Sequence, residues 1–307
     1  MTPLPLRAAV RPTTFIESAR LSHRLGAKVI LASETFQHTG SFKFRAGYNV
    51  ALSVPHRHII TASSGNFGQG LAYACQLLGK SCMVAMPDNS AQVKVDAVCE
   101  LGGAVDMIDL KKTTRKARVA ELAREFPDAY VASAYDDPLV IEGNATLGDE
   151  LAAAPYRFDC VIAPVGGGGL TSGIITGLRR SGSLALVIGA EPLLANDAAR
   201  SLRAGEIIAN ETEPQTIADG TRTLSLGQHN WAILKNGLES IVEVPEENIR
   251  EAVRLLFTLA NLKAEPTGAL SVAALLTAPE LFSDQRVCCV ISGGNADPST
   301  FAEMIAT

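Results

Sequence analysis

Strong net charge is missing from this 307-residue chain, in which 27 lysines and arginines stand against 32 aspartates and glutamates, for a formal charge of −5. A protein that binds nucleic acid electrostatically needs a basic surface, so the sequence argues against a polyanionic partner. Aromatic residues (5%) and charged residues (19%) are also few, whereas hydrophobic residues reach 47%. That proportion is enough for a large core and excludes a mainly disordered chain.

The chain also lacks a long apolar run. Its longest stretch without a charge, residues 160–178, contains six glycines, which would leave much backbone unshielded in lipid, so we expect no membrane span. Residues 1–15 lack a basic start followed by an apolar segment, so no secretory signal is indicated and we expect a cytoplasmic location. Six cysteines without CxxC spacing favour buried thiols in a reducing compartment.

What the chain does contain is an alternation of apolar runs and helical stretches. It starts at His58 with HIITAS, GQGLAYACQLLG, SCMVAMP and SAQVKVDAVCELG, and we expect a charged helix at residues 111–126. A second series follows FDCVIAPV, with helices expected at residues 171–180 and 246–262 and a buried strand in RVCCVIS. Alternation of this kind predicts βα units, mainly parallel sheets and hence the α/β class.

The clearest motif is a run of four glycines, Gly166–Gly169, expected by chance in only roughly 0.02 chains of this composition. Glycines can adopt positive φ and gather several N–H groups on one concave surface, and the positive end of a following helix would point there. These features predict a site for a phosphate dianion. A turn needed only for close packing of strand against helix is the alternative.

Lys43 follows the flexible turn Gly40–Ser41 and lies between two apolar neighbours, Phe42 and Phe44. Partial burial would lower the pKa of the amine, and a neutral amine can attack an aldehyde to form a Schiff base. Lys43 is therefore a candidate for a covalent cofactor anchor and for proton transfer. Because Arg45 is close, an ordinary surface cluster is the alternative.

Polar residues follow two of the expected strands, at the edge where ligands bind in parallel sheets. Ser63, Ser64 and Asn66 lie in SSGNFG after HIITA, and Ser292 begins SGGN after RVCCVI. Two alternatives remain: the first two hydroxyls could cap the next helix, and SGGN could be a plain turn.

Together, GSFKFRAGYN, SSGNFGQ, VGGGGL, EPTGA and SGGN have the order and approximate spacing of the fold type II pyridoxal phosphate enzymes. From about Thr13 to Asn295, the chain resembles their serine racemase and serine/threonine dehydratase branch. The resemblance implies a two-domain fold like that of tryptophan synthase β, with twisted, parallel-rich sheets flanked by helices. We expect residues 1–57 and 137–307 to form a large cofactor-binding domain, residues 58–136 to form a small domain, and the cofactor to lie between them.

The resemblance implies a role for each motif. Lys43 would hold pyridoxal phosphate covalently, Asn66 would bond the ring's 3′-oxygen, and Ser292 would face the ring nitrogen. The phosphate would be bound by the four glycines of the tetraglycine loop, Gly166, Gly167, Gly168 and Gly169. Two further residues of these motifs complete the expected cofactor site: Phe42 and Glu265.

The substrate's carboxylate is expected at the SSGNF loop because its charge suits the adjacent helix N-terminus. The residues expected to receive it are Ser63, Ser64, Asn66 and Phe67, with Arg115 as a further candidate. Lys43 would remove the Cα proton. Ser64 is the second catalytic candidate, because racemases of this branch supply a proton from that position on the opposite face.

A third segment, GAEPLLANDAA, is similar to the racemase segment that binds a divalent cation. The corresponding groups here are Glu191, the carbonyl of Ala195, and Asp197. An all-oxygen set suits magnesium, calcium or manganese, and we expect such an ion to brace the fold rather than take part in chemistry. A solvated loop is the alternative.

The predicted reaction is elimination of water from a β-hydroxy amino acid, giving a 2-oxo acid and ammonia, as in an ammonia-lyase. The substrate would be serine, threonine or a related 3-hydroxy amino acid such as hydroxyaspartate. Phe67 in place of a usual histidine, Tyr135 before Asp136, and Asn144 in place of a usual glutamine keep bulkier or acidic substrates open. The family likeness also suggests a homodimer.

Two other functions remain open at this point. One is an amino-acid racemase that uses Lys43 and Ser64 on opposite faces of the substrate. The other, from a different class, is a non-catalytic protein that binds a phosphate ligand through the tetraglycine loop. A nicotinamide oxidoreductase is disfavoured because no GxGxxG motif follows a strand.

Overall fold

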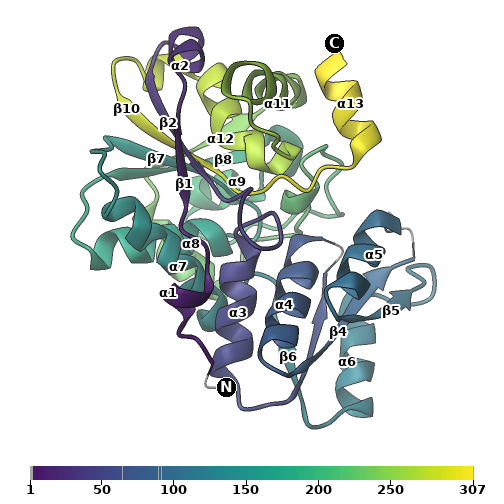
Figure 1. Cartoon of the computed structure of the whole chain (residues 1–307). Coiled ribbons are helices and arrows are strands. Elements are labelled where there is room, and N and C mark those ends of the chain that lie inside the picture. The colour runs from purple at the N-terminus through teal and green to yellow at the C-terminus, as the bar shows by residue number, and fades with distance from the viewer. Residues whose placement is uncertain (1–2, 64, 89, 91, 307) are drawn as a thin grey trace.

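The computed structural model describes residues 3–63, 65–88, 90 and 92–306, which fold around two sheets (Figure 1). The larger sheet has six strands in the order β1-β2-β10-β7-β8-β9. Its strands are β1 (Thr14–Glu17), β2 (Lys28–Ser33), β7 (Cys160–Pro164), β8 (Leu186–Pro192), β9 (Ser240–Val244) and β10 (Arg286–Ile291). Strand β1 runs antiparallel to β2, and the other neighbours in this sheet pair in parallel.

The smaller sheet has four strands, all paired in parallel, in the order β5-β4-β3-β6. Its strands are β3 (His58–Ala62), β4 (Ser81–Pro87), β5 (Ala104–Ile108) and β6 (Ala129–Ala132). These four strands come from residues 58–132, and the larger sheet takes its strands from both sides of that segment. The predicted α/β class with parallel-rich sheets is confirmed.

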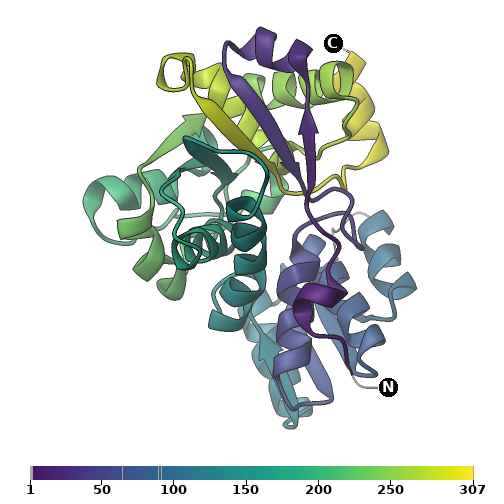
Figure 2. The same cartoon turned by 60° about the vertical axis from the view of Figure 1, so that its left-hand side comes forward.

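Helices connect the strands and cover both sheets (Figures 1 and 2). The α-helices are α1 (Leu6–Ala9), α2 (Ala19–Leu25), α3 (Lys43–Ser53), α4 (Asn66–Leu77), α5 (Gln92–Glu100), α6 (Arg115–Glu125), α7 (Pro138–Ala152), α8 (Gly169–Arg180), α9 (Asp197–Ala204), α10 (Gln228–Gly237), α11 (Glu246–Ala260), α12 (Pro266–Thr277) and α13 (Pro298–Ala306). Short 3-10 helices are η1 (Leu193–Ala195), η2 (Asp219–Thr221) and η3 (Pro279–Leu281). No helix in the described part of the chain combines the length and apolarity that crossing a bilayer requires.

Local capping explains where two helices depart from the prediction. The helix expected from residue 111 begins at Arg115, because the side chain of Thr114 accepts a hydrogen bond from the backbone N–H of Ala117 and caps it there. Helix α8 begins at Gly169, two residues earlier than expected, directly after Gly168 with a left-handed φ of 95°. The long amphipathic helix is confirmed as α11, which ends at Asn261 in the left-handed conformation.

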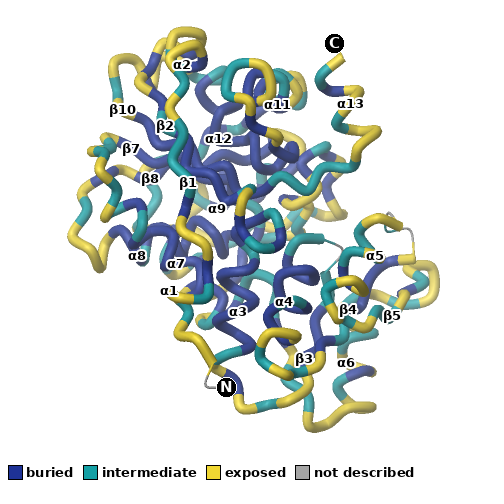
Figure 3. Tube along the Cα trace, viewed as in Figure 1, coloured by how far each residue is buried: buried dark blue, intermediate teal, exposed yellow. Residues whose placement is uncertain are grey.

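The strands β7 and β10 lie in the middle of the larger sheet and are buried along most of their length (Figure 3). Their thiols, Cys160, Cys288 and Cys289, are fully shielded from solvent, and Cys75 and Cys82 are also buried. The prediction of buried free thiols is confirmed for these five, whereas Cys99 is exposed.

Helix α3 lies beside α4 at the junction of the two sheets (Figure 1). Phe44 and Tyr48 of α3 share one hydrophobic cluster with Phe67 and Leu71 of α4. This packing places α3, which precedes residue 58, against the smaller sheet's helices. The division into domains at residues 58 and 136 stays a prediction.

Candidate active site

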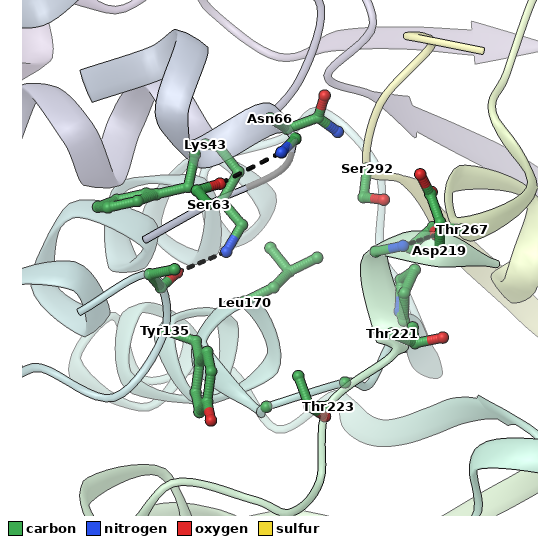
Figure 4. A pocket seen from close by; sticks show the side chains of 18 of the residues that line it. Lys43, Ser63, Asn66, Tyr135, Leu170, Asp219, Thr221, Thr223, Thr267 and Ser292 are labelled. Atoms are coloured by element: carbon green, nitrogen blue, oxygen red, sulfur yellow. Dashed lines mark hydrogen bonds between the residues drawn. The ribbon is translucent and has the colours of Figure 1, made fainter. Parts of the chain in front are cut away.

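A cavity of about 210 Å³ is lined by residues that follow strands of both sheets, among them Ser63 after β3 and Ser292 after β10 (Figure 4). It brings together nearly all the residues expected for cofactor and substrate. Those that line it are Phe42, Lys43, Ser63, Asn66, Phe67, Arg115, Gly166, Gly167, Gly168, Gly169, Glu265 and Ser292. Ser64 lies outside the described residues. The metal candidates Glu191, Ala195 and Asp197 do not line this cavity.

Lys43 is the first residue of α3, and its side chain points into the cavity (Figure 4). Its Nζ donates a hydrogen bond to the carbonyl of Ala134 at 2.6 Å and lies 5.1 Å and 5.6 Å from the ring centroids of Phe42 and Phe67. Burial lowers the pKa of Lys43 to about 8. An appreciable fraction of the amine is therefore neutral near neutral pH and can act as a nucleophile or base.

Arg45 does not form the surface cluster considered as the alternative for Lys43. Its guanidinium is fully buried and pairs with Glu34 at 2.7 Å and Glu150 at 2.8 Å, with a further hydrogen bond to Thr13 at 3.0 Å. A buried charge stays only where it is paired in this way. The network fixes the first turn of α3, which begins at Lys43.

The tetraglycine loop connects β7 to α8 and forms one wall of the cavity. A Cβ at Gly168 would lie 2.8 Å from Leu234, and one at Gly169 would lie 2.7 Å from the carbonyl of Tyr135. Close packing therefore requires glycine at both positions, which agrees with the alternative that the glycines serve the packing of strand against helix. The same loop also faces the cavity at the start of α8, where N–H groups have no partner within the helix, so it can bind an anion as well.

Asn66 sits at the start of α4 with its side-chain amide fixed on both sides. Its Nδ2 donates to Glu265 Oε1 at 2.7 Å, and its Oδ1 accepts from Asn295 Nδ2 at 2.8 Å. The second hydrogen on Nδ2 remains to donate to a ligand oxygen. Burial, together with the charge of Asp219, raises the pKa of Glu265 to about 7.

Ser292 follows β10 and is almost completely buried. Its Oγ has no hydrogen-bond partner within the described structure, although it lines the cavity (Figure 4). A buried hydroxyl without a partner is unusual, so the Ser292 hydroxyl is available to a ligand in the cavity. A ring nitrogen is a chemically suitable partner.

Ser63 lies just after β3 and caps the next helix. Its Oγ accepts hydrogen bonds from the backbone N–H groups of Gly65 at 3.3 Å and Gly68 at 3.1 Å. The capping alternative is therefore correct for Ser63, but the hydroxyl proton can still be donated into the cavity. Phe67 is buried and gives the cavity an apolar wall beside this helix terminus.

Several other residues also line the cavity, although the sequence predicted no binding or catalytic role for any of them. They are Ala62, Lys94, Ala134, Tyr135, Pro164, Leu170, Asp219, Gly220, Thr221, Thr223 and Thr267. Lys94 of α5 pairs with Asp219 of η2, and Arg115 of α6 lies 3.5 Å from Glu213. Both pairs connect a helix of the smaller sheet to the segment after α9. No local sequence pattern indicates that these two parts of the chain lie close together.

The cation candidates form a buried cluster at the end of β8, not the solvated loop considered as the alternative. Both carboxylates are almost completely shielded, and Glu191 accepts hydrogen bonds from the N–H groups of Ala198 at 3.0 Å and Ala199 at 2.9 Å. Asp197 accepts one from Asn210, while its Oδ2 has no partner within the described structure. The orphaned oxygen and the all-oxygen donor set fit a hard cation.

A lysine with a lowered pKa faces a glycine-rich loop that can bind an anion. In an α/β fold, this combination is typical of one class of enzyme. It is the class that attaches a phosphorylated aldehyde cofactor covalently. A family model described as "Pyridoxal-phosphate dependent enzyme" matches residues 6–293. The chain belongs to this family, which confirms the predicted family and fold.

Known relatives agree with this assignment. The β-hydroxyaspartate dehydratase of Paracoccus denitrificans is 34% identical, covering 95% of this chain and 93% of the relative. The serine racemase of Schizosaccharomyces pombe is 32% identical, covering 96% and 92%. The crystal structure of the T.th. threonine deaminase superposes with a TM-score of 0.89 at 39% identity, covering 95% of this chain and 97% of that one.

Proposed function

We propose that this chain is a pyridoxal phosphate-dependent ammonia-lyase that eliminates water from a 3-hydroxy amino acid, with 3-hydroxyaspartate as the preferred substrate. The observation that carries the proposal is the position of Lys43, whose amine has a lowered pKa and faces the same cavity as the tetraglycine loop. The relatives named for dehydration of hydroxyaspartate and deamination of threonine support the reaction type.

The residues around the cavity fit pyridoxal phosphate. Lys43 would hold the aldehyde carbon, the tetraglycine loop would hold the phosphate, and the orphaned hydroxyl of Ser292 would meet the ring nitrogen. Asn66 would donate its remaining amide hydrogen to the 3′-oxygen, with Phe42 and Glu265 beside it. When bound, the cofactor supplies an acceptor for the negative charge that develops at Cα.

The chain's own groups supply the rest of the chemistry. The start of α4, with Ser63 and Asn66, would bind the α-carboxylate through N–H and O–H donors and the positive helix end. The Lys43 amine can accept the Cα proton because its pKa is close to neutrality. The hydroxyl of Ser292 is neutral, so it cannot stabilise a positive charge on the ring nitrogen as a carboxylate would. The ring would then be a weaker acceptor for the negative charge from Cα, which favours elimination over a reaction in which that charge stays on the ring for long.

An acidic substrate suits the outer part of the cavity. Beyond Lys43, the described residues that line it include two with cationic side chains. Lys94 pairs with the carboxylate of Asp219, whereas Arg115 makes only a 3.5 Å contact with Glu213 and is the better candidate to bind a second carboxylate. A second substrate carboxylate at this wall would gain charge-assisted hydrogen bonds that serine or threonine cannot form. The apolar ring of Phe67 would lie against the carbon skeleton.

Racemisation is the second candidate, because the relatives include a serine racemase. The proposed proton donor on the opposite face, Ser64, lies outside the described residues. Elimination ranks first because it needs only Lys43 as a base. A homodimer, a cytoplasmic location and a cation held by Glu191, the Ala195 carbonyl and Asp197 complete the proposal.

The deciding experiment incubates the purified, cofactor-loaded protein with single isomers of 3-hydroxyaspartate, serine and threonine. Ammonia, 2-oxo acid and the inverted amino acid are measured in parallel. We expect equal amounts of ammonia and 2-oxo diacid from one 3-hydroxyaspartate isomer, with the highest kcat/KM of the set. Inversion faster than ammonia release would establish a racemase instead, and Lys43→Ala serves as the inactive control.

A further inference from the structure

Two buried asparagines hold the tetraglycine loop from the side away from the cavity. Nδ2 of Asn230, in the first turn of α10, donates to the carbonyl of Gly167 at 2.7 Å. Nδ2 of Asn144, on α7, donates to the carbonyl of Gly169 at 3.0 Å. Both side chains are fully shielded, so these amides serve the loop and not solvent.

Fixing a carbonyl also fixes the N–H of the next residue, because the two belong to one planar, trans peptide unit and point in opposite directions. A carbonyl of Gly167 held by Asn230 therefore turns the N–H of Gly168 away from Asn230. The Gly169 carbonyl, held by Asn144, does the same for the N–H of Leu170. Both Gly168 and Leu170 line the cavity.

Asn230 also connects the loop to a segment from the smaller sheet. The same Nδ2 donates to the carbonyl of Tyr135 at 3.0 Å, two residues before Asp137, where α7 is capped. The carboxylate of Asp136 accepts from the N–H groups of Gln228 and His229, each at 2.9 Å, at the start of α10. One amide thus fixes the tetraglycine loop relative to the segment after β6 that contains Tyr135.

We infer that Asn230 is a positioning residue for the phosphate site, with Asn144 in a parallel role. Asn230 would orient the peptide plane whose N–H is offered to the phosphate, and Asn230 itself does not line the cavity. The inference rests on the proposed role of the tetraglycine loop as the phosphate site. The backbone N–H of Gly227 also donates to the Gly167 carbonyl, at 3.1 Å, so losing the Asn230 amide would leave that peptide plane with one of these two donors and hold it less firmly.

The test compares pyridoxal phosphate with pyridoxal, which lacks the phosphate. The full-length chain is stripped of cofactor, and the dissociation constants of both compounds are measured by absorbance and fluorescence for wild type, Asn230→Ala and Asn144→Ala. A matched control is Asn248→Ala, the third residue of α11 as Asn230 is of α10, whose amide donates to Thr277 away from the cavity. Thermal unfolding of each stripped protein reports on folding.

We expect Asn230→Ala to weaken pyridoxal phosphate binding roughly tenfold, while pyridoxal binding changes less than about twofold. The Asn144→Ala variant should show the same pattern, and Asn248→Ala neither effect. Equal weakening for both compounds, or none, would overturn the inference. If wild type itself does not prefer pyridoxal phosphate to pyridoxal, the proposed phosphate site fails instead. Should Asn230→Ala not fold, Asn144→Ala decides alone.

Discussion

The ring of Tyr135 occupies the space next to Gly167 so fully that a Cβ at Gly167 would lie 2.2 Å from Tyr135 Cδ2. Real Cβ atoms do not approach carbon so closely, so position 167 cannot take a larger residue while the Tyr135 ring stays in place. Tyr135 follows β6 of the smaller sheet, whereas Gly167 follows β7 of the larger one. The contact therefore couples the proposed phosphate site to the position of the other sheet.

Gly167→Ala should weaken the binding of pyridoxal phosphate roughly ten- to hundredfold, since relieving an overpacked contact of this kind costs about 1–3 kcal/mol. Titration of the stripped protein measures this directly. Adding Tyr135→Ala should restore part of the affinity, because it removes the atoms that the new methyl group meets. Unchanged binding by Gly167→Ala would show that the loop does not hold the phosphate.

The lowered pKa of Lys43 predicts how cofactor attachment depends on pH. Only the neutral amine attacks the aldehyde, so the rate of attachment should rise with pH and level off with a midpoint of about 8, in place of the usual value near 10.4. Borohydride trapping at timed intervals between pH 6 and 10 gives the profile. A midpoint near 10 would mean that the amine is solvated and not buried as described.

Much of the site could be predicted because each motif is contiguous in the sequence. The tetraglycine loop and the SSGNF segment are each a few residues long and follow an apolar strand, and Lys43 lies in the short segment GSFKF at the start of α3. Parallel strands bring their carboxyl ends to one edge, so placing the strands also places the motifs. The fold class followed from the same alternation of strands and helices.

The residues that were missed depend on tertiary packing alone. Asp219, Thr221 and Thr223 lie in and after the short helix η2, within a long connection that carries no periodicity or glycine signature. Asn230 lies in the first turn of a helix, as many polar residues do, and only its contacts reveal its role. The positions of these side chains depend on which loops come into contact in the folded protein. A single sequence does not show those contacts.

Glu265→Gln should stabilise the stripped protein increasingly as pH rises from 5 to 8. Burial raises the pKa of Glu265 to about 7, so the carboxyl stays protonated in the folded protein at pH values where the unfolded chain has lost the proton. The raised pKa therefore contributes folding stability that is fully present below about pH 4.5 and is lost as the pH rises through 7. The amide of glutamine does not titrate and avoids that loss.

The difference in unfolding free energy between the Glu265→Gln variant and wild type should therefore grow to about 3 kcal/mol at pH 8, from the shift between the usual pKa and about 7. Urea unfolding at several pH values measures it, and other titrating groups cancel in the comparison. A difference independent of pH would contradict the raised pKa.

Asp197→Asn tests the proposed cation site. Wild type should gain thermal stability from millimolar magnesium, calcium or manganese, because an ion would satisfy the orphaned Oδ2 and the two buried carboxylates together. The variant keeps a side chain of the same shape but loses one negative charge, so the gain should disappear. Equal stabilisation of both proteins by the ions would contradict this assignment.

Arg115→Met should discriminate between substrates. Losing a charge-assisted hydrogen bond costs about 1.5–3 kcal/mol, so KM for 3-hydroxyaspartate should rise about tenfold or more, while the constants for serine change little. Glu213, the partner left behind, is well exposed and needs no compensation. The neighbouring Lys116 is exposed and does not line the cavity, which makes Lys116→Met the matched control. If Arg115→Met impaired serine and 3-hydroxyaspartate equally, Arg115 would instead bind the α-carboxylate that both substrates share.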